Sequence, residues 1–157
     1  MVSPLRSAVA LLLAVAAAPL EGQSPPNLSG TWTLQVAESD LGPIPAPDSR
    51  VDVIEHQEPR ITIRRSVVSQ GQETSTELRY AVDGERHVNT AGGLEMGSRL
   101  SWNGATLTMI SSAQTPQGEV GLVDVFTLSE DGQTLTQART LTIGGQELRQ
   151  RLVLKKQ

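Results

Sequence analysis

The stretch that decides the fold is residues 118–154, GEVGLVDVFTLSEDGQTLTQARTLTIGGQELRQRLVL. Apolar and polar residues alternate in three runs within it, a pattern typical of β-strands that bury one face. The runs span residues 119–128, 133–143 and 146–154. Asp131-Gly132 and Gly144-Gly145 separate them, and both pairs favour the two-residue turns of β-hairpins because they tolerate positive φ angles. The stretch therefore predicts two consecutive antiparallel hairpins.

Turn length predicts which side chains face each other, because the turn of a hairpin sets its register. Two-residue turns pair Leu128 with Leu135 and Leu141 with Leu148. Upstream turns at Pro116-Gln117 and Asn103-Gly104 extend the pairing to Ser111 with Leu122, Leu107 with Phe126, and Leu100 with Leu107. The predicted inner face consists of Met96, Leu100, Trp102, Leu107, Met109, Leu122, Phe126, Leu128, Leu135, Leu141, Leu148, Leu152 and Leu154.

The same alternation recurs about every ten residues through the rest of the chain. Further strands are expected at residues 30–36, 50–56, 60–68, 73–82, 85–89, 96–102 and 105–114. After the first of them, residues 37–49 carry Pro43, Pro45 and Pro47, which predict an extended loop. Nine or ten strands joined by short turns predict an all-β, antiparallel up-and-down meander. Closure into a barrel is favoured because it removes the exposed edges of so wide a sheet, and two stacked sheets are the alternative.

One row of the predicted inner face is polar. The register sets Asp124 opposite Arg139 and Arg139 opposite Gln150, with Met109 opposite Asp124 on the preceding strand. Isolated buried charges are costly, so this row must be internally hydrogen-bonded or wet. Two interpretations stay open. Arg139, oriented by Asp124 and Gln150, meets the carboxylate or other polar head of a ligand, or the Asp–Arg pair is self-satisfied and only ties two strands together.

An Asp83-Gly84 turn adds a second candidate group, because it pairs Tyr80 with His87 on the same face. These side chains are expected either to line a pocket mouth or to form a structural hydrogen bond. The other histidine, His56, lies on a distant strand, and the chain has no cysteine, so the spacing predicts no zinc site and no cofactor. No Gly-x-Ser-x-Gly motif is present, and the chain is not expected to be an enzyme.

The N-terminus carries a processing signature. Arg6 precedes an apolar run over residues 8–18, and small and polar residues follow it. This pattern predicts a signal peptide over residues 1–22, a linker over 23–29 and one domain over 30–157, and hence a secreted or periplasmic protein. An uncleaved anchor is the alternative, but the run is far shorter than the roughly 20 residues that span a bilayer, so no membrane span is expected after cleavage.

The opening of the first strand resembles a known family. Gly30-Thr31-Trp32 resembles the Gly-x-Trp opening of the calycins, which include lipocalins, fatty-acid-binding proteins and avidins. Together with Glu38-Ser39-Asp40 and residues 128–135, LSEDGQTL, it makes the chain similar to small lipocalin-like proteins exported by bacteria. The resemblance implies an antiparallel barrel of eight to ten strands, with Trp32 at the closed end and a lumen for small hydrophobic molecules.

The chain departs from fatty-acid-binding proteins in two places. Those proteins have a helical lid after the first strand, whereas residues 41–49 here are rich in proline. They also carry an Arg-x-Tyr carboxylate anchor on the last strand, whereas Arg149 and Arg151 have no tyrosine beside them and point outward in the predicted register. The resemblance therefore implies the fold more directly than the ligand.

Composition narrows the function. The net charge is −4 with no basic cluster, so no nucleic-acid partner is expected. Only 3% of the residues are aromatic, and the few large side chains favour a lumen. The first hypothesis is a binding protein for a small hydrophobic or amphipathic molecule, in which Arg139, Tyr80 and His87 contact its polar end. The alternative is an envelope protein with a filled barrel that acts on a protein partner through residues 41–49. The oligomeric state is not predicted.

Overall fold

The computed structural model describes residues 24–157, so the predicted signal peptide lies outside the described residues. Ten β-strands and one short 3-10 helix, η1 (Val36–Glu38), make up its regular structure. The strands are β1 (Gly30–Leu34), β2 (Ser49–Gln57), β3 (Arg60–Ser69), β4 (Gln72–Ala81), β5 (His87–Ala91), β6 (Leu94–Asn103), β7 (Thr106–Thr115), β8 (Gly118–Leu128), β9 (Thr134–Ile143) and β10 (Gln146–Lys156). No helix within residues 24–157 is long and apolar enough to cross a membrane.

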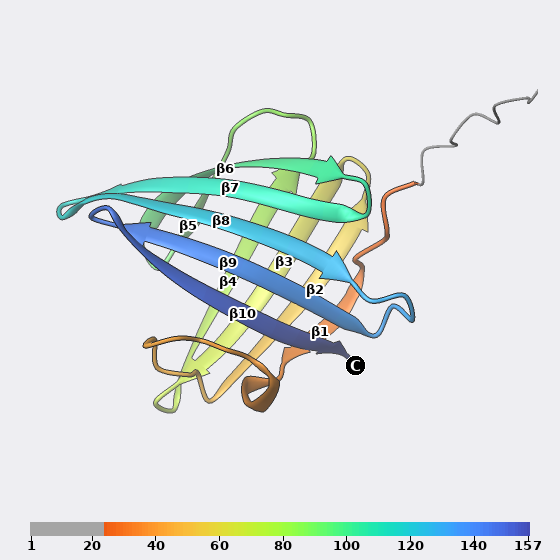
Figure 1. Ribbon diagram of the computed structural model, residues 1–157, viewed down its shortest axis with the longest axis horizontal. Coiled ribbons are helices and arrows are strands. Elements are labelled where there is room, and N and C mark those ends of the chain that lie inside the picture. The colour runs from red at the N-terminus through yellow and green to blue at the C-terminus, as the bar shows by residue number, and fades with distance from the viewer. Residues whose placement is uncertain (1–23) are drawn as a thin grey trace, which may run out of the picture.

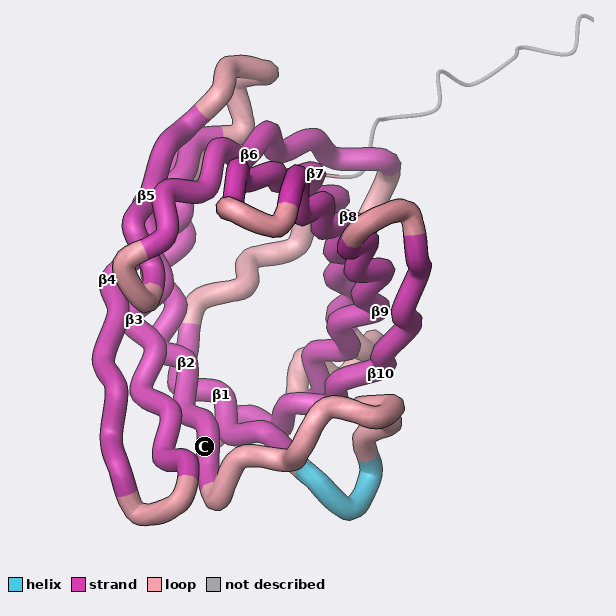
Figure 2. The backbone as a smooth tube through the Cα atoms, turned by 90° about the vertical axis from the view of Figure 1, so that its left-hand side faces the viewer, coloured by secondary structure: helices cyan, strands magenta, loops and turns pink. Residues whose placement is uncertain are grey.

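All ten strands belong to one antiparallel sheet, which confirms the predicted meander. Its order is β4-β3-β2-β1-β10-β9-β8-β7-β6-β5, so strands that pair are consecutive in sequence except for β1 and β10, and β4 and β5 form the two edges. In Figure 1, β2 to β4 cross behind β6 to β10, and Figure 2 shows the strands arranged as a ring. The sheet is therefore curled into a nearly closed barrel, and the alternative of two stacked sheets is wrong.

The predicted register is confirmed at three of the four turns that set it. Leu128 lies opposite Leu135, and Leu141 lies opposite Leu148. The pairing of β7 with β8 is also as predicted, with Ser111 opposite Leu122 and Leu107 opposite Phe126. Because these turns are tight, sequence alone determines which residues point inward.

The prediction for the turn between β6 and β7 was wrong by one residue. Gly104 and Ala105 form this turn, so Asn103 pairs with Thr106 and Leu100 lies opposite Met109 rather than Leu107. Gly104 takes the first turn position with φ +59°, a conformation that glycine adopts without steric cost. The partners move by two residues along the strand, so the same side chains still face inward.

The predicted Asp83-Gly84 hairpin does not form. Within the described chain, β4 and β5 share no ladder of backbone hydrogen bonds, and β5 pairs only with β6, with His87 opposite Ser98. The connection is held by Asp83, whose carboxylate accepts hydrogen bonds from the backbone of Glu85 and from the His87 ring. The predicted pairing of Tyr80 with His87 is therefore wrong.

One end of the barrel is closed by residues 24–29, which cross it in Figure 2. Leu28 is only 3% exposed and packs into the core. Its backbone N–H donates to His56 Nδ1 at 3.1 Å, and its carbonyl accepts from Trp32 Nε1 at 2.9 Å. Gly30 has φ +146°, and a side chain there would overlap Lys156, which lies over the Trp32 ring. This packing explains the glycine and the tryptophan of the Gly-x-Trp opening.

The loop after β1 lies at the opposite end. Its first residues form η1 rather than the last part of a strand, so β1 ends two residues earlier than predicted. Asp40 then pairs with Arg151 through two backbone hydrogen bonds of 2.8 Å. Ser39 accepts a hydrogen bond from the backbone of Val153. The proline-rich loop is thus attached to β10 where β1 no longer covers it.

Candidate functional site

The barrel encloses a cavity of about 180 Å³ on the far side of Met109 and Phe126 from Leu28. One part of its wall is apolar and comes from strands β3 to β8, and the other part is polar and charged. The lining residues are Ile63, Arg65, Leu78, Tyr80, Asn89, Ala91, Met96, Met109, Ser111, Leu122, Asp124, Phe126, Gln137 and Arg139. The arrangement suits a molecule with an apolar body and a polar end.

Asp124 and Arg139 form the first ion pair of this wall, as the predicted register requires. Arg139 donates to both carboxylate oxygens of Asp124, through Nε at 2.7 Å and Nη2 at 3.0 Å. Gln137 donates to the same carboxylate at 2.9 Å. Asp124 and Gln137 are completely buried, whereas the Arg139 side chain keeps 21% of its surface exposed. The acid is therefore enclosed by protein, and the arginine faces the cavity.

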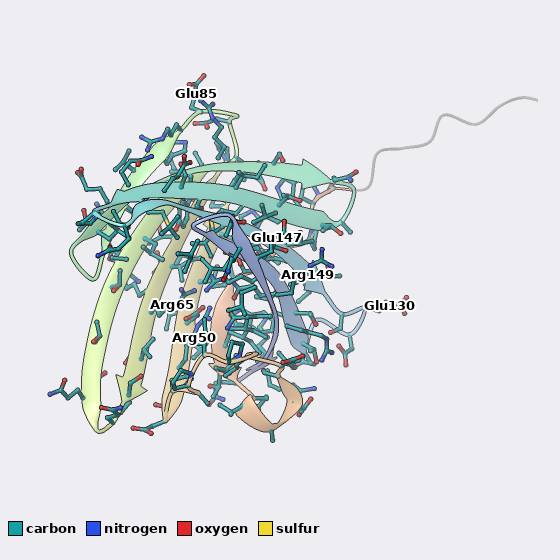
Figure 3. All side chains as sticks on the ribbon, turned by 60° about the vertical axis from the view of Figure 1, so that its left-hand side comes forward. Arg50, Arg65, Glu85, Glu130, Glu147 and Arg149 are labelled. Atoms are coloured by element: carbon teal, nitrogen blue, oxygen red, sulfur yellow. The ribbon has the colours of Figure 1, made fainter. Side chains whose placement is uncertain are left out.

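A second carboxylate holds two arginines. Asp52 on β2 accepts two hydrogen bonds from Arg65 on β3, both at 2.8 Å. It also accepts two from Arg50 on its own strand, at 3.1 and 2.6 Å. Arg50 Nη2 also donates a hydrogen bond to Gln137 Oε1 at 3.2 Å, and this bond joins the two groups of ion pairs into one network. In Figure 3, Arg50 and Arg65 lie inside the barrel, whereas Arg149 lies outside it.

Burial and pairing shift the pKa values of this network in opposite directions. Burial lowers the pKa of Arg50 to about 10, so the group stays charged at neutral pH. Burial alone would raise the pKa of Asp52, but the hydrogen bonds from Arg65 and Arg50 hold it well below the usual range. Burial raises the pKa of Tyr80, which keeps its hydroxyl neutral. At neutral pH Arg50 is therefore a guanidinium ion and Asp52 a carboxylate.

The arginines keep hydrogen-bond donors that the protein does not use. Arg50, Arg65 and Arg139 each bind a carboxylate through Nε and Nη2. Within residues 24–157, none of the three Nη1 atoms has a hydrogen-bond partner, yet no buried side-chain nitrogen or oxygen lacks one. Each Nη1 must therefore border accessible space. Arg65 and Arg139 both line the cavity.

The structure brings four of the six predicted site residues together. Arg139, Asp124, Met109 and Tyr80 all line the cavity. Their binding of a ligand stays a prediction.

The other two predicted site residues have different roles in the structure. Gln150 lies opposite Arg139, but its side chain donates to the carbonyl of Leu41 at 2.8 Å, so it holds the proline-rich loop and does not orient Arg139. His87 Nε2 lies 2.9 Å from Asp83 Oδ1, and the ring does not line the cavity.

Sequence reasoning missed Arg50, Asp52, Arg65 and Gln137. Apolar alternation in β2 is misleading, because Val51 and Val53 point outward while the two charged residues beside them are buried. A signal was present nonetheless. A two-residue turn at Glu58-Pro59 pairs Asp52 with Arg65, and this is the register observed. Like the pair on β8 and β9, it places opposite charges directly across from each other.

Two other kinds of candidate site, an outer groove and a metal site, have less support than the interior cavity. A groove of about 370 Å³ lies on the outer face of β2 to β4, beside the exposed Arg64–Glu77 ion pair, and its polar side chains face solvent. Among residues 24–157, no group of three histidine, aspartate or glutamate side chains is placed to hold a metal ion. The interior cavity, where charged groups are buried beside unfilled space, is therefore the candidate site.

No protein-family model and no curated protein matches the chain. Several solved structures match its fold. Zebrafish ileal bile acid-binding protein complexed with cholic acid matches with a TM-score of 0.59 and 16% identity, over 83% of this chain and 98% of that chain. Human cRBP IV gives a TM-score of 0.56 and 20% identity, over 85% and 100%. Secretory abundant heat soluble protein 4 from Ramazzottius varieornatus gives 0.58 and 16%, over 83% and 94%. These similarities confirm a calycin-type barrel.

Proposed function

We propose that this chain is an exported binding protein that holds a small, partly hydrophobic molecule with a carboxylate group inside its barrel. The observation that carries the proposal is the cavity of about 180 Å³, which is lined by an apolar wall and by Arg65 and Arg139, two arginines that each keep an unused Nη1 group. A planar guanidinium is suited to carboxylate recognition. Binding by this fold is also supported by the matching bile acid-binding protein, whose structure holds cholic acid.

Export rests on the N-terminal pattern of the sequence. An apolar run follows Arg6, and the described domain begins only a few residues after it. We expect the protein to be cleaved between residues 17 and 23 and released into the periplasm or the medium. N-terminal sequencing of protein recovered from that compartment tests this. A chain that keeps Met1, or that stays in the cytoplasmic fraction, contradicts export without affecting the binding proposal.

Binding is tested by native mass spectrometry of protein purified from its own source, together with a thermal-shift panel of carboxylic acids. We expect a retained small molecule, and stabilisation of about 2.7 kcal/mol when an added acid is present at a hundred times its dissociation constant. A bare protein mass with no stabilisation by any acid contradicts the proposal.

Two substitutions locate the binding. Arg139→Gln removes a cavity donor and should abolish the thermal shift. Arg149→Gln removes an arginine that is 81% exposed on the outside of β10, and it should leave the shift unchanged. Equal loss in both variants would argue for a non-specific effect of charge.

A further inference from the structure

We propose that the cavity selects a compact monoanion, a monocarboxylate whose apolar part is one ring or a short chain, over long-chain acids, dianions and neutral molecules of the same shape. This inference rests on the proposed function, because it specifies what the same cavity holds. Three features of the interior carry it: the charge balance of the buried network, the number of unused donors, and the shape of the space beneath them.

The charge balance favours one negative charge. Among the residues that the structure describes, Arg50, Arg65 and Arg139 pair only with Asp52 and Asp124, so the network carries one net positive charge. Tyr80, which also lines the cavity, is neutral. In a poorly solvated interior an uncompensated charge is costly, and a single carboxylate would neutralise it. A second carboxylate on the same ligand would leave the interior with one net negative charge.

The donors favour a carboxylate near the polar wall. Arg65 and Arg139 each present an Nη1 group, with two N–H bonds, that no described residue accepts. Both side chains are 21% exposed, so solvent reaches them and a ligand could replace it. Charge-assisted hydrogen bonds to such a group are about twice as strong as neutral ones. Benzoate should therefore bind more tightly than benzyl alcohol, which has the same ring and no charge.

The shape of the interior limits the size of the apolar part. A cavity of about 180 Å³ is close to the roughly 150 Å³ that accommodates benzene, and it is below the 300–1,000 Å³ of typical drug-sized sites. Met109 and Phe126 form its floor. Beneath them only about 10 Å³ of space remains between the floor and Leu28. A long chain therefore cannot continue toward the closed end of the barrel.

The test is isothermal titration of the full mature protein with benzoate, benzyl alcohol, phthalate and dodecanoate. Benzoate should bind about ten- to a hundredfold more tightly than benzyl alcohol. It should also bind more tightly than phthalate, because of its single charge, and more tightly than dodecanoate, because of its size. Tighter binding of dodecanoate or phthalate overturns this inference and leaves the proposed function standing. Failure of every acid to bind removes both.

Two variants separate charge from size. Gln137→Glu adds one negative charge to the buried network at nearly constant side-chain shape. Benzoate should then lose its advantage in affinity over benzyl alcohol. Benzyl alcohol, which is neutral, should still bind and so show that the cavity is folded. Met109→Ala opens the floor, and dodecanoate should gain about tenfold in affinity from the apolar surface it can then bury. Arg149→Gln is the control for both. An unchanged preference for benzoate over benzyl alcohol in Gln137→Glu overturns the charge argument, and an unchanged affinity for dodecanoate in Met109→Ala overturns the size argument.

Discussion

Asp52 and Asp124 show how this barrel keeps charges in its interior. Asp52 accepts four hydrogen bonds from two arginines, and Asp124 accepts three, one of them from a buried glutamine. Every buried side-chain nitrogen and oxygen in the described chain has a partner. Such a network tolerates burial because no group in it is left unsatisfied, and for the same reason the removal of one member is costly.

Loss of Asp124 should therefore destabilise the protein strongly. We expect Asp124→Ala to lower the free energy of unfolding by about 3 kcal/mol, near the lower end for broken buried ion pairs, because Arg139 can still be solvated from the cavity. Urea denaturation measures this. Glu77→Ala, which removes two exposed ion pairs on the outer face, with Arg64 and with Arg79, should leave the unfolding free energy nearly unchanged. A loss below about 1 kcal/mol for Asp124→Ala would mean that water fills the space around the pair.

Asp52 should make stability depend on pH. Its pKa in the folded protein lies below the value of about 3.9 in an unfolded chain, so the carboxylate stabilises the fold above that value. The stabilisation is lost as the pH falls below about 4 toward the folded-state pKa. Urea denaturation at pH 6 and at about pH 3 should show a smaller difference for Asp52→Asn than for wild type. Asp83→Asn, at an exposed carboxyl, should keep most of that difference, and parallel curves for wild type and Asp52→Asn would contradict the assignment.

For single residues, the sequence predicted the inward-facing positions correctly where the turn geometry and the apolar alternation indicate the same face of the strand. Asp124 and Arg139 were found because apolar neighbours on both sides determine the inward face of β8 and β9. Asp52 was not predicted because the two valines beside it face outward, whereas apolar residues of a strand usually face the core. The side-chain bond of Gln150 to Leu41 joins positions 109 residues apart, and no local pattern indicates it.

Among the strands and loops, some are determined by nearby sequence and others by contacts with residues far away in the chain. Tight turns fix hairpins such as β8–β9 and β9–β10 within a few residues, and these were predicted. The segment after β1 depends on β10, more than a hundred residues later, through contacts such as Asp40 with Arg151. Its 3-10 turn and its attachment to the sheet therefore could not be predicted from its own sequence.

Segment 24–29 offers a test at this scale. Leu28 donates its N–H to His56 Nδ1, so the proton of the neutral ring lies on Nε2, which faces Glu58 at 2.8 Å. We expect His56→Leu to leave the buried Leu28 amide without an acceptor, at a cost of about 1–3 kcal/mol, and to speed its hydrogen exchange. His56→Asn can place an amide oxygen where Nδ1 lies and should retain most of the protection. Equal protection in both variants would show that packing alone holds the segment.

Closure of the whole barrel followed from the argument that a sheet this wide must remove its edges, but the manner of closure did not. The seam between β4 and β5 is joined by a side chain. Asn89 accepts a hydrogen bond from the backbone N–H of Arg79 at 2.7 Å and donates to its carbonyl at 3.0 Å. A single amide thus imitates one ladder pair where the described strands form none.

The seam should consequently be the first part of the barrel to open. We expect Asn89→Leu to raise the hydrogen-exchange rate of the Arg79 amide at least about tenfold, while amides in the β7–β8 ladder, such as Thr108 and Val125, keep their wild-type rates. Asn89→Asp keeps the acceptor and loses the donor, so its effect on the same amide should be smaller. Uniform acceleration over the whole sheet would instead indicate global destabilisation.

The first and last described segments meet at one pole of the molecule. The backbone N–H of Gln157 donates to the carbonyl of Thr31, and Lys156 covers the ring that Leu28 also contacts. The cavity lies beyond Met109 and Phe126, toward the other pole. A bead, sensor chip or fused enzyme coupled through either terminus would accordingly sit behind the barrel and leave the route to its arginines facing the buffer.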